Sequence, residues 1–330
     1  MKKMFAPALL ALALAACGDS VNPVAPARAG GTEPSLAVGY EPAASVMMVH
    51  GYSPGNGGFD CASLWANQKS ALSSYGHTGR RITVGYYNLN TNCERNLSST
   101  VYTRNYAGDW TLVRGTDNGR GGILDHNTPI EHVAYRLAWA IAKENTDNGA
   151  ASVRVIGYSM GGLAIRYAIQ QASAGNINFP TLTQMNVSRV ITYGTPHSGT
   201  NYGWGGLSTQ SNQMGTNSSF ITSLNGDARV GSATWIGFTS LYTFTGDGVV
   251  ENNSACWVKM TWCGRHYGSV AGNGYPSRSG YWHGDYMGDT NISYTLAEWD
   301  TKNPSTGSAW SARFRDVGAA GMAARNLAQY

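Results

Sequence analysis

The chain has 330 residues, and charged residues make up 13% of it, whereas roughly a quarter is usual for soluble domains. The formal net charge of +4 at pH 7 is small and the basic residues are scattered, so the sequence gives no support to nucleic-acid binding. The length allows one large domain or two small ones, and the order of the predicted elements has to decide between them.

The first residues have the pattern of an export signal. A basic start at residues 1–3 precedes the apolar run of residues 5–16, which is too short to span a bilayer comfortably. The run ends in Leu-Ala-Ala-Cys, which is similar to the lipobox of bacterial lipoproteins and implies that residues 1–16 are removed and Cys17 is acylated on its sulfur. The alternative is an ordinary signal peptide cut at an Ala-x-Ala site, with Cys17 incidental. The position of Cys17 directly after the small residues favours lipidation.

The segment after the signal is predicted to be a tether. Residues 17–43 contain several Pro and Gly among small and polar residues and have little apolar area to bury, as in a flexible linker. Residues 44–330 fit one α/β domain with an elaborated loop region. We expect a monomer that is exported to the cell envelope and anchored to a membrane by its N-terminal lipid, or secreted if the lipobox is not used.

Four cysteines remain besides Cys17. An even count in an exported chain predicts disulfides, and four cysteines allow three pairings. The local pairs Cys61–Cys93 and Cys256–Cys263 are the simplest choice. A zinc site competes with this interpretation, but the sequence has no Cys-x-x-Cys pair to favour it.

Strand and helix patterns alternate along the domain. Residues 45–49 form an apolar run typical of a strand buried on both faces of a parallel sheet, and a crossover helix over 64–72 connects it to a strand over 81–87. A strong helix start follows, with Thr128 as the cap, Pro at the first helical position and Glu131 completing a capping box. This alternation predicts right-handed crossovers and a doubly wound, mostly parallel sheet.

The next strand and helix enclose a serine that the pattern marks as a nucleophile. Residues 153–156 are a short β-branched run, residues 157–161 have the pattern Gly-x-Ser-x-Gly, and a helix-forming segment follows. A strand that turns sharply into a helix at Ser159 is a nucleophile elbow, which strains the serine and exposes its Oγ above the sheet. The same pattern occurs at residues 51–55, but the Pro and Gly that follow Ser53 cannot open a helix. Context therefore selects Ser159 and rejects Ser53.

Three motifs together resemble those of the α/β-hydrolase family, and within it the bacterial lipases and esterases. They are Val-His-Gly-Tyr at residues 49–52, Gly-Tyr-Ser-Met-Gly-Gly at 157–162 and Tyr-Gly-Thr-Pro-His-Ser-Gly at 193–199, and they occur in the family's order. The resemblance covers most of the chain after about residue 43. It implies the α/β-hydrolase fold, which agrees with the doubly wound sheet predicted from the alternation of elements.

Two further strands are predicted at residues 189–193 and 241–245. Between them, residues 199–235 are rich in Gly, Ser, Asn and Thr and contain an amphipathic piece at 220–224. The family resemblance implies a small cap or lid in this place. An ordinary surface excursion is the alternative.

A serine hydroxyl needs a base to take its proton, and a third group must orient that base. The family resemblance implies the chain order Ser, then Asp or Glu, then His, which removes the histidines before Ser159. We predict Asp247 as the acid, because it follows a strand and lies between glycines that allow the loop to turn. A plain turn aspartate is the competing interpretation of its Asp-Gly pair, and Asp227 is the alternative acid.

The predicted base is His283. It precedes a segment over 292–299 that we predict to be helical, and the family resemblance implies that the histidine lies between the last strand and the last helix. His266 is the alternative, but it lies three residues beyond Cys263, in a segment expected to be tied into a disulfide loop.

The oxyanion on the attacked carbonyl needs two backbone donors, and the resemblance implies the N–H groups of Met160 and Tyr52. His50 and His197 are expected to hold their own loops. Two aspartates shortly after His283 fall short of the six or more oxygens that calcium binds, so we predict no metal and no cofactor.

The sequence therefore predicts a serine hydrolase that cleaves carboxylic esters, similar to a triacylglycerol lipase or carboxylesterase. It would act on a small-molecule or lipid ester through a Ser-His-Asp triad and an acyl-enzyme. An acyltransferase, polyesterase or amidase on the same fold stays open, since the triad does not specify the acceptor or the bond. A non-catalytic surface-binding lipoprotein is the other alternative, against which the complete set of triad candidates argues.

Overall fold

The computed structural model describes residues 43–98, 100–104, 110–114, 124–149, 151–202, 206–226, 237–242, 248–251, 254, 265–268, 283, 294–299, 309–314, 320–321, 323–324 and 327. By its contacts the chain divides into Met1–Thr32 and Glu33–Tyr330, and every described residue belongs to the second unit. The predicted signal peptide, Cys17 and the predicted tether up to residue 42 lie outside the described residues.

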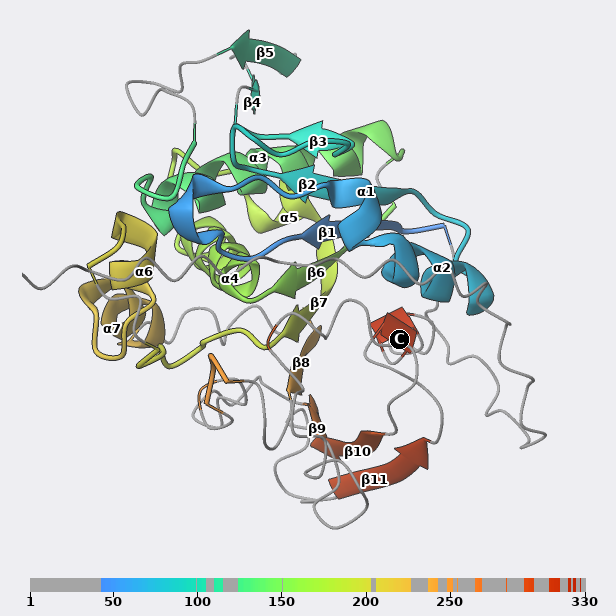
Figure 1. Cartoon of the computed structure of the whole chain (residues 1–330). Helices are drawn as coiled ribbons and strands as arrows, with labels where there is room; N and C mark the ends of the chain where they lie inside the picture. The colour runs from blue at the N-terminus through green and yellow to red at the C-terminus, as the bar shows by residue number, and fades with distance from the viewer. Residues whose placement is uncertain are drawn as a thin grey trace, which may run out of the picture. The chain divides into compact units, whose positions relative to one another are not determined.

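Among the described residues, nine strands form the main sheet (Figure 1). They are β1 (Ser45–Val49), β2 (Arg81–Gly85), β3 (Arg95–Asn96), β6 (Val153–Tyr158), β7 (Val187–Tyr193), β8 (Gly237–Tyr242), β9 (Arg265–Gly268), β10 (Tyr294–Trp299) and β11 (Ala309–Phe314). Their order in space is β11-β10-β9-β8-β7-β6-β1-β2-β3. The strands from β3 to β9 pair in parallel, whereas β10 pairs antiparallel with β9 and β11.

Helices cover both faces of this sheet. On one face lie α3 (Ile130–Asp147), α4 (Met160–Ser173) and the short α5 (Leu182–Met185). On the other lie α1 (Cys61–Leu64), α2 (Ala66–Ser74) and helical residues near the C-terminus. Helices on both faces of a largely parallel sheet confirm the predicted doubly wound α/β fold.

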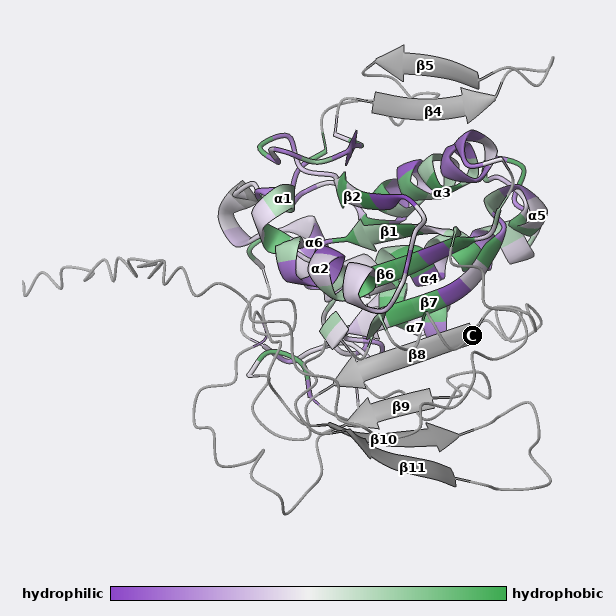
Figure 2. Cartoon of the chain, turned by 90° about the vertical axis from the view of Figure 1, so that its right-hand side faces the viewer, coloured by the Kyte–Doolittle hydropathy of each residue, from purple (hydrophilic) through white to green (hydrophobic). Residues whose placement is uncertain are grey.

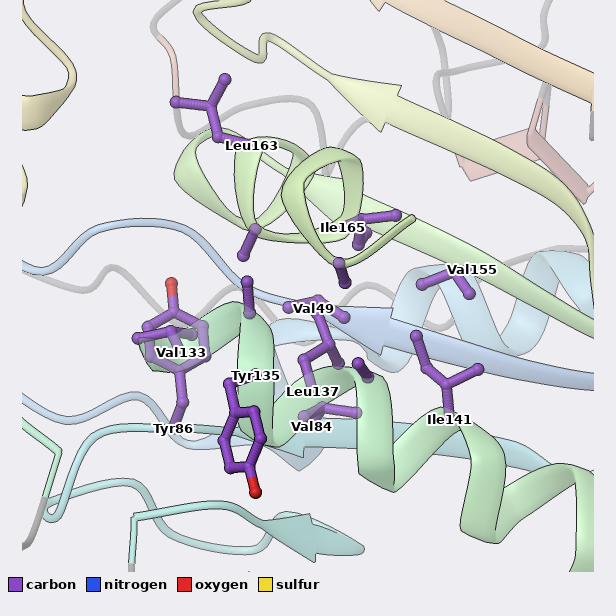
Figure 3. Close-up of a cluster of buried hydrophobic side chains, with 14 of the residues drawn as sticks. Val49, Val84, Tyr86, Val133, Tyr135, Leu137, Ile141, Val155, Leu163 and Ile165 are labelled. Atoms are coloured by element: carbon purple, nitrogen blue, oxygen red, sulfur yellow. The ribbon is translucent and has the colours of Figure 1, made fainter. Parts of the chain in front are cut away.

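The strand sequences explain why the sheet is buried on both sides. In β1, Met47 and Val49 pack in the cluster with α3 and α4, while Val46 and Met48 pack in the cluster with α2. Successive side chains of a strand point to opposite faces, so a continuous apolar run serves two cores. Figure 2 shows hydrophobic residues concentrated on β1, β6 and β7. Figure 3 shows the first core, where sheet residues meet the two long helices, among them Val49, Val84, Val155, Val133, Leu137, Ile141, Leu163 and Ile165.

The region after β7 folds into two further helices, α6 (Thr209–Gln213) and α7 (Ser219–Gly226). The amphipathic piece predicted at 220–224 lies in α7, where Phe220, Ile221 and Leu224 are buried in the first core. The excursion predicted between 199 and 235 is therefore present, and its described part packs against the domain. A separate hairpin, β4 (Thr100–Arg104) with β5 (Trp110–Arg114), was not predicted.

Two local predictions are wrong. The segment 292–299 is not helical, because residues 294–299 form β10 between two antiparallel neighbours. Its aromatic and β-branched residues suit a strand, and the backbone partners that fix it are distant in the sequence. The capping box at α3 is also absent, because Pro129 itself is the N-cap and the Thr128 hydroxyl accepts from the Asp125 N–H at 3.0 Å. Gln213 of α6 instead accepts from the Ile130 N–H, at 2.7 Å.

The Cys61–Cys93 disulfide is confirmed and ties the start of α1 to the segment after β2. Cys256 and Cys263 lie outside the described residues. No helix among the described residues is long and apolar enough to cross a membrane.

Candidate active site

Ser159 forms a sharp turn between β6 and α4. Its φ of 53° and ψ of −126° are unusual for a residue with a side chain, since the left-handed region favours glycine. The Ser159 N–H donates to the Tyr193 carbonyl at 2.7 Å, and the Ser159 carbonyl accepts from the Gly162 N–H at 3.0 Å. Hydrogen bonds on both sides thus hold the strained backbone, as expected for a nucleophile elbow.

The glycines around Ser159 are required by close approach of the backbone. A Cβ on Gly157 would lie 2.8 Å from the Gly162 Cα, where β6 and α4 come together. A Cβ on Gly161 would lie 2.4 Å from the His50 carbonyl oxygen, where α4 meets the end of β1. The elbow predicted from the sequence is therefore confirmed in its backbone geometry.

The second Gly-x-Ser-x-Gly pattern has a different structure. Ser53 has an extended backbone, with φ −115° and ψ 109°, and leads into the single 3-10 turn η1 (Pro54–Asn56). Its N–H donates to the Tyr87 hydroxyl at 3.3 Å. The chain directly after Ser53 thus opens no α-helix, which agrees with the rejection of Ser53 as nucleophile.

The structure brings His283 to Ser159. The His283 Nε2 atom lies 2.7 Å from the Ser159 Oγ, and both residues are buried. The His283 ring packs on the Tyr158 ring, with 5.0 Å between the centroids. His283 lies between β9 and β10, and not between a last strand and a last helix as predicted. The alternative base, His266, lies within β9 in register with Ser240 and Ala297.

Asp247 lies outside the described residues, as does Asp227, so the acid stays a prediction. The chain directly after Asp247 is described and is held by the loop after β7. The Thr200 hydroxyl donates to the Val249 carbonyl, and the Ser198 N–H donates to the Ser254 Oγ at 3.0 Å.

The two predicted oxyanion donors come from two different segments, the start of α4 and the loop after β1. Met160 is the first residue of α4, and an N–H at that position has no acceptor within its own helix. A Cβ on Gly51 would lie 2.8 Å from the Ser159 Cβ, so the loop that carries Tyr52 lies directly against the nucleophile. Their role as donors stays a prediction.

His50 is a buried, neutral structural residue. Burial lowers its pKa from 6.5 to about 3, which keeps the ring uncharged near neutral pH. One ring nitrogen, Nδ1, donates to the Gly51 carbonyl at 2.8 Å, and Nε2 accepts from the Tyr86 N–H at 3.4 Å and from the Asn90 amide. The ring also stacks on Tyr86 at 4.0 Å.

His197 holds the loop after β7, as expected. Its Nδ1 and carbonyl oxygen each lie 3.2 Å from the guanidinium of Arg166 in α4, and its Nε2 lies 3.1 Å from the Thr192 hydroxyl. Nothing near Arg166 in the sequence indicated this buried contact. Within the part of the chain that the structure describes, no group of three or more His, Cys, Asp or Glu side chains could hold a metal ion.

Comparison with known proteins gives one family match. Residues 122–226, from the segment before α3 through the elbow to the end of α7, match a family model described as "Putative serine esterase (DUF676)". This match confirms the resemblance to serine esterases. No curated protein sequence matches the chain.

Several solved structures are similar to the chain at low identity. Lipase B from Aspergillus fumigatus is 17% identical over 67% of this chain and 41% of its own, with a TM-score of 0.41. The phospholipase PlaB from Legionella pneumophila in complex with thio-NAD is 13% identical over 64% and 43%, also at 0.41. The mature lipase BlEst2 from Bacillus licheniformis is 16% identical over 77% and 89%, at 0.40. The chain thus spans less than half the length of the first two proteins.

Proposed function

We propose that this protein is a serine ester hydrolase with the α/β-hydrolase fold, with Ser159 as nucleophile, His283 as base and Asp247 as the acid that orients the base. The observation that carries the proposal is the strained Ser159, with its Oγ 2.7 Å from the His283 Nε2 atom. A nucleophile within hydrogen-bond reach of a base is the arrangement that acyl transfer requires. A surface-binding module has no use for a strained serine paired with a buried histidine.

The proposed reaction has two similar halves. In the first, His283 takes the Ser159 proton while the Oγ attacks the ester carbonyl, and the N–H groups of Tyr52 and Met160 bind the oxyanion. The tetrahedral intermediate collapses, the alcohol leaves with the proton from His283, and the acyl group stays on Ser159. Water then attacks the acyl-enzyme by the same steps and releases the acid. Asp247 stabilises the imidazolium form of His283 in both halves.

Hydrolysis of p-nitrophenyl esters from acetate to palmitate tests this function. We expect release of p-nitrophenol from at least part of the series, with an acyl-enzyme detectable by mass spectrometry after rapid quenching. A maximum at long chains would favour a lipase and one at short chains a carboxylesterase. No turnover of any ester, with the protein folded, would contradict the proposal.

We also propose that Cys17 carries a lipid that anchors the exported enzyme to a membrane. The lipobox-like Leu-Ala-Ala-Cys supports this, and the Cys61–Cys93 disulfide fits an oxidising compartment outside the cytosol. Fractionation of cells that express Cys17→Ser tests it. We expect the variant to leave the membrane fraction, and its retention there would contradict the lipid anchor.

A further inference from the structure

The loop that carries the proposed oxyanion donor, residues 50–53, is held by two buried tyrosines. We call it the oxyanion loop. The Tyr86 hydroxyl lies 2.8 Å from the His50 carbonyl oxygen and 2.5 Å from that of Gly51, and it donates to both. The Tyr87 hydroxyl accepts from the Ser53 N–H at 3.3 Å. The backbone on each side of Tyr52 is thus bound to a side chain of the segment that follows β2.

Tyr87 in turn connects the oxyanion loop to α6. Its hydroxyl donates to the Gln210 Oε1 at 2.6 Å. The Gln210 amide nitrogen donates to the Asp125 carbonyl at 3.0 Å and to the Thr128 carbonyl at 2.8 Å, which fixes the orientation of the amide. Because Oε1 must then face Tyr87, the tyrosine proton is committed to Gln210 and a lone pair remains for the Ser53 N–H.

A second connection joins the side chain of Tyr52 to the same helix. The Tyr52 hydroxyl lies 3.0 Å from the Oγ of Ser208, the N-cap of α6. The Ser208 Oγ also accepts from the Ser211 N–H at 3.1 Å, and this capping box fixes its position. Both ends of the connection are buried, with Tyr52 6% and Ser208 5% exposed. Buried hydrogen bonds of this kind are costly to break, because each leaves a polar group without water or partner.

The helix itself is fixed to the body of the domain. Its Gln210 N–H donates to the His126 carbonyl at 3.2 Å, and Gln213 bonds both the Ile130 N–H and the Glu131 carboxylate. Met214, which ends the helix, is buried in the first core. Because α6 is held by these bonds to α3 and to the segment before it, it does not open as a lid without breaking them together.

We propose that α6 is a fixed support of the active site, whose Gln210 and Ser208 position the oxyanion loop through Tyr87 and Tyr52. They are positioning residues, because neither is placed at the reacting atoms. A backbone donor must lie about 2.7–3.1 Å from the developing oxyanion to stabilise it, so a small shift of the loop weakens the transition state more than the bound substrate. This inference rests on the proposed function.

Gln210→Leu tests the proposal, and Asn145→Leu is its matched control. Asn145 in α3 also carries a buried amide, which donates to the Gln184 carbonyl at 3.0 Å and accepts from the Asn186 amide nitrogen at 3.3 Å. Asn186 directly precedes β7, whereas Ser159 follows the carboxyl end of the parallel strand β6, so the control lies at the opposite edge of the sheet from the active site. Both variants lose hydrogen bonds of a buried side-chain amide, so the melting temperature should fall in both.

The readouts are kcat, KM and the inhibition constant of a trifluoromethyl ketone, which forms a tetrahedral oxyanion on the serine. For Gln210→Leu we expect kcat to fall about tenfold to a hundredfold, less than the roughly 10²–10³-fold loss on removal of an oxyanion donor, because the donor is displaced and not removed. KM should stay within about twofold of wild type. Affinity for the ketone should fall in parallel with kcat. Asn145→Leu should keep kcat and ketone affinity within about twofold of wild type. Tyr87→Phe removes the same connection and serves if Gln210→Leu does not fold.

The outcomes separate this inference from the proposed function. If the wild-type protein hydrolyses no ester, the proposed function itself fails. If it is active and both Gln210→Leu and Tyr87→Phe keep wild-type kcat and ketone affinity, α6 does not position the loop. Equal kinetic losses in Asn145→Leu would show that the effect is one of general stability, which would also overturn the proposal.

Discussion

The chain contains the same five-residue pattern twice, at residues 51–55 and 157–161, and the two copies have different structures. Ser159 has a positive φ of 53° and opens a long helix, whereas Ser53 has a φ of −115° and leads into one 3-10 turn. Both serines are buried. The pattern alone therefore does not make a nucleophile. The segment after it decides whether a helix N-terminus faces the serine, and a distant histidine completes the pair.

The two copies also serve one site. The first glycine of the 51–55 pattern lies against Ser159, and its Cβ would come within 2.8 Å of the serine Cβ. Adjacent parallel strands explain this, because β1 pairs with β6 and their carboxyl ends meet at the same edge of the sheet. One copy supplies the nucleophile, and the other supplies the loop beside it.

Substitution of the two serines should give the largest difference in activity between the two copies. We expect Ser159→Ala to lower kcat for a p-nitrophenyl ester by about 10⁴-fold or more, since the attacking oxygen is lost. Ser53→Ala should keep most of the activity, because its backbone and not its hydroxyl is bound to Tyr87. Steady-state kinetics with both purified variants provide the measurement. Comparable losses of activity in the two variants would contradict the assignment of Ser159, and not Ser53, as the nucleophile.

Substitution of the histidines tests whether His283 is the base that pairs with Ser159. We expect His283→Ala to lose several orders of magnitude in kcat while its melting temperature stays within about a few degrees of wild type. His266→Ala should keep substantial activity. Thermal melts and kinetics on both variants check this, and reversed outcomes would assign the base to β9.

The oxyanion loop should instead affect how the free energy of unfolding depends on pH, through the buried His50. The unfolded chain binds a proton at His50 near its ordinary pKa of 6.5, while burial lowers the folded pKa to about 3. The stabilising contribution of the neutral ring is therefore complete above about pH 6.5 and is lost as the pH falls toward 3. Between pH 7.5 and 4.5 the loss from this residue should be on the order of 3 kcal/mol.

Urea unfolding at several pH values measures this loss. His50→Gln should flatten the dependence, and the part that remains should include His77, whose pKa is lowered to about 4 mainly by burial. If the variant keeps the wild-type slope, His50 is not the neutral buried group described above.

The smallest expected effect concerns the packing of the elbow against the end of β1. A Cβ on Gly161 would lie 2.4 Å from the His50 carbonyl and 2.7 Å from that of Val49, so Gly161→Ala should destabilise the fold by about 1–3 kcal/mol. Gly226, at the end of α7, is the matched helical control, because a Cβ there meets nothing within 4 Å. Chemical denaturation should place Gly226→Ala within about 0.5 kcal/mol of wild type. Equal changes in both would argue against the tight packing of α4 on β1.

The sequence predicted the part of the fold in which local pattern and burial agree. Strand β1 is an apolar run, β6 and β7 are rich in β-branched residues, and the glycines of the elbow follow from close backbone approach, so these features were predictable. The error at β10 has a different cause, because its segment mixes helix formers such as Leu296 and Glu298 with strand formers, and pairing with β9 and β11 decides between the two structures. The hydrogen bonds of Gln210 and Arg166 were not predictable either, since a buried polar residue has no signal until its partner is known.

The site was predicted in part for the same reason. Ser159 followed from its own strand and helix. His283 was predicted partly because a helix was expected over residues 292–299, where the structure has β10. The structure nevertheless places the His283 Nε2 atom 2.7 Å from the Ser159 Oγ. Asp247 rests on its position after a strand and stays a prediction.

The most direct test of the central claim is to find the serine that a fluorophosphonate probe modifies. The folded protein is labelled with the probe, digested and mapped by mass spectrometry, with heat-denatured protein as the control. We predict one adduct, on the peptide that contains Ser159, and its loss in both the denatured control and His283→Ala. An adduct on Ser53, or no adduct on the folded protein, would contradict the assignment of Ser159 and His283 as the reactive pair.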